Sequence, residues 1–130
     1  MKLFWPVALM VVIFCLSSIP GVPRDGQFRV MTDLDPTVQN FLHIPLFGLL
    51  QWFWLKGLTT PGRSLGVVIG LATFITFAYA SLDELHQAMV PGRYASVQDI
   101  FLDAVGVVLG TLFFLFISMR SDRFRVRRRS

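Results

Sequence analysis

Most of the side chains that could do chemistry in this chain lie in one short stretch, from Asp83 to Asp99. Asp83 follows a long run without charge, and on a continuing helix it shares a face with His86 and Gln87, three and four residues on. A Pro-Gly pair then turns the chain before Arg93. Carboxylates, an imidazole and a guanidinium at this spacing are typical of sites that transfer protons or bind phosphate and carboxylate groups.

Three polar residues continue this pattern after the turn. Ser96 has the type and position of a helix N-cap, and Asp99 would then be its capping-box partner. Asp103 lies one helical turn further along the same face. A carboxylate deep in lipid costs about 2.5–3.5 kcal/mol, so Asp103 should face other helices or water. We expect it to pair with Arg93 or His43, or to be protonated.

Four apolar runs must position these residues. The chain has 130 residues, 54% of them hydrophobic and 15% charged, and a soluble domain of this size would expose too much apolar surface. Each run is about as long as the 17–25 residues that span a bilayer, and in lipid each must be helical. The runs cover residues 3–19, 38–55, 65–82 and 100–119. We therefore predict an all-α integral membrane four-helix bundle, a single membrane domain over residues 1–130 with a basic tail at 120–130.

The first run has an alternative interpretation as a cleaved signal peptide, because Lys2 precedes it and two serines end it. Ile19-Pro20 follows these serines and leaves no small-residue cleavage site, which favours an uncleaved span. The single cysteine, Cys15, excludes an intrachain disulfide and a multi-cysteine metal site.

Lysine and arginine residues set the predicted orientation. Nine of the twelve basic residues fall on one side of the membrane, namely Lys2, Lys56, Arg63 and the six arginines of the tail. The other three are Arg24, Arg29 and Arg93. Both termini of this multi-pass chain are therefore predicted to be cytoplasmic, and the tail should anchor the topology and contact anionic lipid.

In this orientation the polar residues of three spans and one loop fall at the outer face of the membrane. Scattered surface polarity would populate both ends alike, so we predict a polar cavity in the outer leaflet. A structural ionic latch that closes the bundle is the alternative. The residues concerned are His43, Asp83, Glu84, His86, Gln87, Arg93, Asp99 and Asp103.

Proline and glycine predict details of helix packing. Pro45 lies inside the second span and should kink it near Phe41. Gly106 and Gly110 lie on the face of Asp103 and would let another helix approach closely, as would the pair Gly66 and Gly70.

These residues together resemble the VanZ-like family. The resemblance covers about residues 5–117 and rests on His43, on Asp83-Glu84-x-His86-Gln87-x-x-x-Pro91-Gly92-Arg93-x-x-Ser96-x-x-Asp99, on Gly106-xxx-Gly110 and on Ser17-Ser18-x-Pro20. Three positions depart from the family: Asn40 stands where lysine is frequent, Phe47 where tyrosine is common, and Asp103 where asparagine is frequent. A phosphate-binding role at Asn40 is therefore not carried over.

The resemblance implies a small bacterial inner-membrane protein with four helices. The family's named member gives low-level resistance to teicoplanin, a lipoglycopeptide. Our first hypothesis is a non-catalytic factor of the cell envelope, or of glycopeptide or lipoglycopeptide tolerance. It would bind a membrane lipid headgroup, a lipid-linked envelope precursor or a lipoglycopeptide. The expected ligand-binding residues are Arg93, which would meet phosphate or carboxylate, and Asp83, Glu84, Gln87, His43, Asp99 and Asp103.

Two alternatives stay open. The first is an intramembrane hydrolase of a lipid-linked phosphate, with Arg93 as oxyanion stabiliser and a divalent ion held by carboxylates and histidine. Its base would be Asp83 or Glu84 and its acid His43 or His86. The chain lacks a serine nucleophile motif, a glycine-rich phosphate loop and a zinc-protease signature, so we assign no metal site and no cofactor.

The second alternative is a structural partner of another membrane protein, which would dock through Gly106 and Gly110. Nucleic acid is not an expected partner, because half of the basic residues lie in the last eleven residues of the chain.

Overall fold

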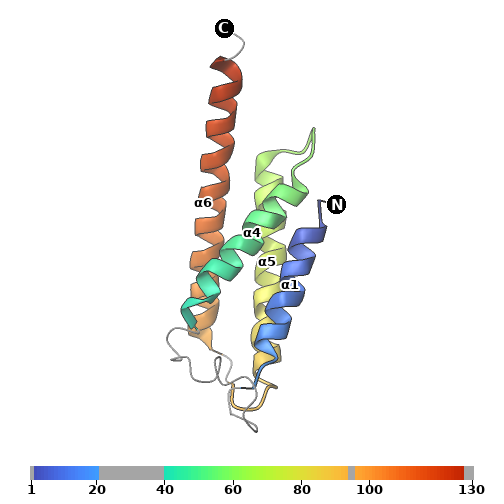
Figure 1. Ribbon diagram of the computed structural model, residues 1–130, viewed down its shortest axis with the longest axis vertical. Helices are drawn as coiled ribbons and strands as arrows, with labels where there is room; N and C mark the ends of the chain where they lie inside the picture. Colours follow the sequence, from blue (N-terminus) through green and yellow to red (C-terminus); the bar gives the residue numbers. More distant parts are fainter. Residues whose placement is uncertain (1, 21–39, 94–95, 128–130) are drawn as a thin grey trace.

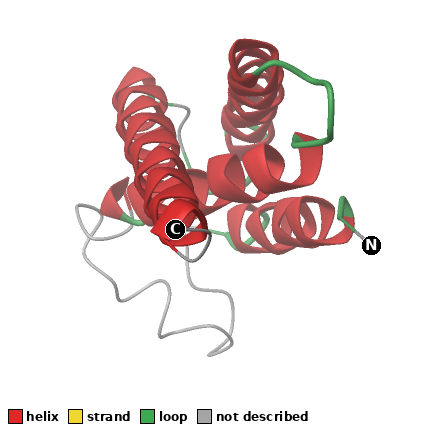
Figure 2. Cartoon of the chain, turned by 90° about the horizontal axis from the view of Figure 1, so that it is seen from above, coloured by secondary structure: helices red, strands yellow, loops and turns green. Residues whose placement is uncertain are grey.

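The described part of the chain is entirely helical. The computed structural model describes residues 2–20, 40–93 and 96–127, with side chains as far as Arg120 (Figure 1). Within these residues it contains four helices and no strand (Figure 2). They are α1 (Phe4–Ser17), α4 (His43–Leu58), α5 (Leu65–Gln87) and α6 (Val97–Arg127). The predicted all-α class is therefore confirmed for the described residues.

Two helices extend beyond the apolar runs that predict them. α5 begins at Leu65 as predicted but continues through Gln87, so the first acids of the polar stretch are helical. α6 begins at Val97 and continues into the basic tail as far as Arg127. Residues 38–39 of the predicted second span and the loop arginines Arg24 and Arg29 lie outside the described residues.

The structure interrupts the second span next to the position where the kink is predicted. Residues 40–41 are helical, Leu42 forms a turn, and α4 begins only at His43. Pro45 lies in the first turn of α4 and has no N–H for the carbonyl of Phe41, while Leu42 keeps a helical backbone. The interruption therefore coincides with the hydrogen bond that the proline cannot donate.

α4 is the helix that joins the bundle together. It packs against α1, α5 and α6. One apolar core cluster links α1, α4 and α5 through Ile13, Phe47, Leu50 and Ala80, and a second links α4, α5 and α6 through Leu55, Val68, Ala72 and Phe114.

A buried glutamine adds polar contacts between three of these helices. Gln51 on α4 is fully buried, and its Nε2 donates to the hydroxyls of Thr73 on α5 and Thr111 on α6, at 3.1 Å each. Its Oε1 accepts a bond of 2.9 Å from Thr76. Both ends of the amide are hydrogen-bonded, so these bonds offset the cost of removing the polar group from water.

The closest approach of two helices is made through glycine. A Cβ on Gly106 would lie 2.5 Å from the Ile44 carbonyl oxygen of α4, and one on Gly110 would overlap the carbonyl oxygen of Gly48. The predicted close approach at Gly106 and Gly110 is thus made to a helix of the same chain. The other predicted pair, on α5, has open space where a Cβ would be added at either glycine.

The surface of the bundle is strongly apolar. Exposed large hydrophobic residues occur on all four helices, for example Trp5, Leu49, Phe74 and Phe113. Among the described residues, α5 and the part of α6 from Val97 to Arg120 are long and apolar enough to cross a membrane. α1 is apolar but shorter, with 14 residues.

Candidate functional site

The polar residues singled out in the sequence gather at one end of the bundle. The chain direction explains this, because α1 and α5 end there and α4 and α6 begin there (Figure 1). Five of the eight are buried, and His43, His86 and Arg93 are partly buried. Their hydrogen bonds, and in the second group also proximity alone, divide them into two networks and one separate contact, a division that the sequence did not predict.

The first network, here called the α1–α5 network, joins Ser17, Asp83, Gln87 and Arg93. Asp83 Oδ2 accepts hydrogen bonds of 2.9 Å from Ser17 Oγ and from Gln87 Nε2. Arg93 Nη1 donates to Gln87 Oε1 at 3.4 Å. The guanidinium therefore reaches Asp83 only through the glutamine. The predicted shared face of Asp83 and Gln87 is confirmed.

His86 makes a contact of its own with α1. Its Nε2 lies 2.9 Å from Ser18 Oγ, and its ring stacks on that of Phe14 at a centroid distance of 4.5 Å. Within the described residues no hydrogen bond links His86 to the other candidates. The second histidine of the chain thus supports the packing of α1 on α5.

The second network, here called the acid–histidine cluster, consists of His43, Glu84, Asp99 and Asp103. His43 Nδ1 lies 2.9 Å from Asp103 Oδ1, and Asp103 is almost completely buried, with 1% of its side chain exposed. Of the two partners expected for Asp103, His43 and Arg93, the structure shows His43. A stack of the imidazole on the ring of Phe47, with an interplanar angle of 6°, further fixes its orientation.

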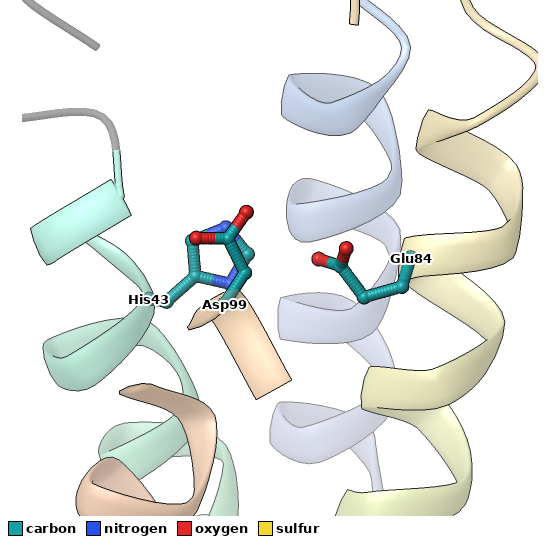
Figure 3. Close-up of side chains that lie close together, drawn as sticks. All are labelled: His43, Glu84 and Asp99. Atoms are coloured by element: carbon teal, nitrogen blue, oxygen red, sulfur yellow. The ribbon is translucent and has the colours of Figure 1, made fainter. Parts of the chain in front are cut away.

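Three helices bring three members of this cluster into one small space. One ligand-type atom each from His43, Glu84 and Asp99 lies within 4.8 Å of the other two. Figure 3 shows the Glu84 carboxylate of α5 directed toward the imidazole from α4 and the carboxylate from α6.

Glu84 takes the role that the sequence gives to Asp99. Ser96 Oγ accepts from Gln98 N at 3.1 Å, so the predicted N-cap of α6 is confirmed. In a capping box, the residue at the third helical position would accept the N–H of the cap. Here that N–H donates to Glu84 Oε2, at 2.8 Å. Asp99 is therefore not the capping-box partner and is left to face the cluster.

Several buried polar atoms in these networks have no hydrogen-bond partner within the part of the chain that the structure describes. Native proteins leave few such atoms, because an unpaired buried polar group costs free energy. Four belong to carboxylates and one to a guanidinium: Asp83 Oδ1, Glu84 Oε1, Asp99 Oδ1, Asp103 Oδ2 and Arg93 Nε. The polar end of the bundle therefore combines hydrogen bonds between helices with buried carboxylate oxygens that are still able to accept a hydrogen bond or bind a cation.

Two contributors went unassigned in the sequence. Ser17 holds Asp83, and Gly48 provides the surface against which Gly106 and Gly110 pack. Ser17 could have been found from the sequence, because it is a hydroxyl in the last turn of an apolar run, at the end predicted to hold the acids. Gly48 carries no signal of its own, because its partner glycines lie about 60 residues away in the sequence.

Comparison with known proteins adds a family match. The model of the family described as VanZ/LLP1 matches residues 3–118. The matched region includes α1, α4, α5 and both polar networks. No curated protein and no solved structure matches the chain.

Proposed function

This chain belongs to the VanZ/LLP1 family, and on that premise we propose that it is a multi-pass protein of the bacterial inner membrane that binds an envelope ligand at the polar end of its bundle. Its physiological role would be in the cell envelope, as a factor in tolerance of glycopeptides or lipoglycopeptides. The ligand would be a lipid headgroup, a lipid-linked envelope precursor or a lipoglycopeptide, recognised by phosphate or carboxylate groups.

The distribution of apolar and basic residues supports a four-pass arrangement. Hydrophobic side chains cover the outside of the bundle, and α5 and α6 can each cross a bilayer. α1 begins and α6 ends at the same end of the molecule, opposite the acids (Figure 1). Lys2, Lys56 and Arg63 also belong to that end. By the positive-inside rule, both termini would be cytoplasmic and the polar networks would lie toward the outer leaflet.

The proposed binding role rests on the surroundings of the Arg93 guanidinium. It is partly buried, its buried Nε has no partner among the described residues, and the side-chain hydrogen bond that it donates to Gln87 is long, at 3.4 Å. A guanidinium held in this way can donate two parallel hydrogen bonds to a phosphate or carboxylate. Gln87, itself held by Asp83, would orient the guanidinium.

The experiment is complementation of a deletion strain, with susceptibility to glycopeptides and lipoglycopeptides as the readout. Arg93→Lys keeps the charge but loses the planar fork, so we expect it to insert normally and to lose complementation. Asp83→Asn should also lose it, because the orientation of Gln87 changes. Arg63→Lys is the matched control. Arg63 is exposed at the other end, where it donates to the Leu58 carbonyl, so this variant should complement fully.

Membrane levels of each variant are checked by immunoblot. Full complementation by both Arg93→Lys and Asp83→Asn, at normal abundance, would leave the networks as a structural latch and overturn the proposed binding role.

A second candidate function is an intramembrane hydrolase of a lipid-linked phosphate. The acid–histidine cluster favours it, because a partly buried histidine paired with one carboxylate and close to two more could move a proton. Glu84 and His43 would be the base and acid, since Asp83 is held by Ser17 and Gln87, and His86 by Ser18. Turnover of a lipid phosphate by the purified chain, abolished in His43→Gln, would favour the enzyme.

A further inference from the structure

The acid–histidine cluster contains more negative charge than its protein partners offset. Glu84, Asp99 and Asp103 are each at least nine-tenths buried. Each has one buried carboxylate oxygen without a partner. The two basic side chains whose charge acts on Asp99 are His43 and Arg93, and the first is charged only when protonated. Buried carboxylates that are not paired usually bind a cation or take up protons.

The spacing of the groups suits a metal ion. An ion of the size of Zn²⁺ or Mn²⁺ sits about 2.1 Å from nitrogen and oxygen ligands, so two of its ligands lie at most about 4.2 Å apart. The ligand atoms of His43, Glu84 and Asp99 are within 4.8 Å of one another, which a small side-chain rotation would reduce to that distance. Both carboxylates point into the space between the helices, as Figure 3 shows.

Asp103 supplies an independent indication. Metal-binding histidines generally donate the N–H of their second ring nitrogen to a carboxylate or carbonyl, which fixes the tautomer and orients the ring. His43 has this arrangement, since its Nδ1 lies 2.9 Å from Asp103 Oδ1 and its ring stacks on Phe47. The hydrogen bond leaves Nε2 as the nitrogen that can ligate.

We propose that the acid–histidine cluster binds one divalent metal ion of the Zn²⁺ or Mn²⁺ class, with His43, Glu84 and Asp99 as ligands and Asp103 as the residue that positions His43. One imidazole and two carboxylates are ligand types that both ions accept. The two carboxylates and the metal ion would then compensate one another's charge inside the bundle. The sequence assigned no metal here because the three ligands are spread over three helices and form no contiguous motif.

The ion would also change what the polar end attracts. Without it, the buried carboxylates of Glu84, Asp99 and Asp103 would disfavour an anionic ligand. With it, the charge of the ion would offset the carboxylates of Glu84 and Asp99, and open coordination positions could accept a phosphate or carboxylate oxygen. This second step rests on the proposed binding function, whereas the metal site itself does not.

The test uses the full chain, purified in detergent without an affinity tag, stripped with a chelator and titrated with Zn²⁺ and, separately, Mn²⁺. Bound metal is measured by elemental analysis, and Mn²⁺ also by electron paramagnetic resonance. We expect one ion per chain. The chain has two histidines, which provide a matched pair of variants: His43→Gln should lower the affinity at least tenfold, and His86→Gln should leave it unchanged.

Asp99→Asn is the second ligand variant and should also lower the affinity at least tenfold. Asp103→Asn should lower it by about 10–100-fold, as for other residues that orient a ligand. Circular dichroism and gel filtration check the fold of each variant, and a variant that does not fold is replaced by Glu84→Gln.

Two results would overturn the metal site: no saturable binding of either ion by the wild-type chain, or equal affinity in the His43 and His86 variants. The susceptibility assay with Arg93→Lys separates this outcome from failure of the proposed function. An absent metal together with loss of complementation by Arg93→Lys would reject the site and retain the function. A bound metal together with full complementation by Arg93→Lys would retain the metal site and reject the proposed function.

Discussion

At the scale of single residues, the position of one hydroxyl decides whether a buried carboxylate is satisfied. Asp83 is 4% exposed, and it depends on Ser17 and Gln87 for its two hydrogen bonds. The neighbouring Ser18 donates instead to the Phe14 carbonyl and contacts His86 at the surface of the α1–α5 contact. Two adjacent serines therefore have unequal importance for stability.

Ser17→Ala should lower the free energy of unfolding by about 1–3 kcal/mol, because it leaves a buried carboxylate with one donor fewer. Ser18→Ala is the control and should cost less than half as much, since water can replace its contacts. The measurement is a denaturant or thermal unfolding curve in detergent, followed by circular dichroism. Equal destabilisation by the two changes would contradict the assigned role of Ser17.

The residue-level predictions from sequence succeed where the partners are close in the chain. The Asp83–Gln87 pair and the Ser96 cap follow from spacings of a few residues. The His43–Asp103 pair was one of several possibilities, and the replacement of Asp99 by Glu84 at the cap was not foreseen. Both depend on how α4, α5 and α6 cross, which local spacing does not determine.

At the scale of elements, the contact of α4 with α6 depends on three glycines. Gly48, Gly106 and Gly110 bring the two backbones together directly below the acid–histidine cluster. Any side chain there would separate the helices that hold His43 and Asp103, so the packing and the cluster are coupled.

Gly110→Ala should destabilise the bundle by about 1–3 kcal/mol, because its Cβ would overlap the Gly48 backbone, which cannot rotate away. Gly70→Ala is the matched control. Nothing lies within 4 Å of its added Cβ, and alanine is the better helix former, so stability should be unchanged or raised by about 0.5–1 kcal/mol. Unfolding in detergent compares the two variants, and a neutral Gly110→Ala would show that α4 and α6 are not held at this distance.

The helices themselves were predicted to within a few residues where apolar runs have sharp ends. α1 and the start of α5 agree with the sequence prediction. α5 runs further than its apolar run because its polar end is held by Ser17 of α1 and by the N–H of Ser96 before α6. The interruption at Leu42 agrees with the proline at position 45, which hydropathy alone does not detect because the apolar run continues through it.

At the scale of the whole molecule, the separation of charge along the bundle predicts its orientation. A reporter fusion tests it. Alkaline phosphatase joined after residue 30 should be active, because that loop would lie outside, and the same enzyme joined after residue 130 should be inactive. A cytoplasmic reporter at the same two positions is the control and should give the opposite pattern. Phosphatase activity at the tail, with none at residue 30, would reverse the proposed topology.

The unequal lengths of the helices have a consequence for the surrounding lipid. With 14 and 16 residues, α1 and α4 are about 21 and 24 Å long, whereas a typical hydrocarbon core is about 30 Å thick. A four-pass bundle would meet this mismatch by thinning the bilayer beside the short helices. Its unfolding temperature should therefore be higher in bilayers of 14-carbon than of 22-carbon phospholipids, and independence of chain length would contradict this. In the proposed orientation, such a thinned patch would bring the outer headgroups closer to Arg93 and the acids beside it, so the membrane itself would deliver lipids to the polar end of the bundle.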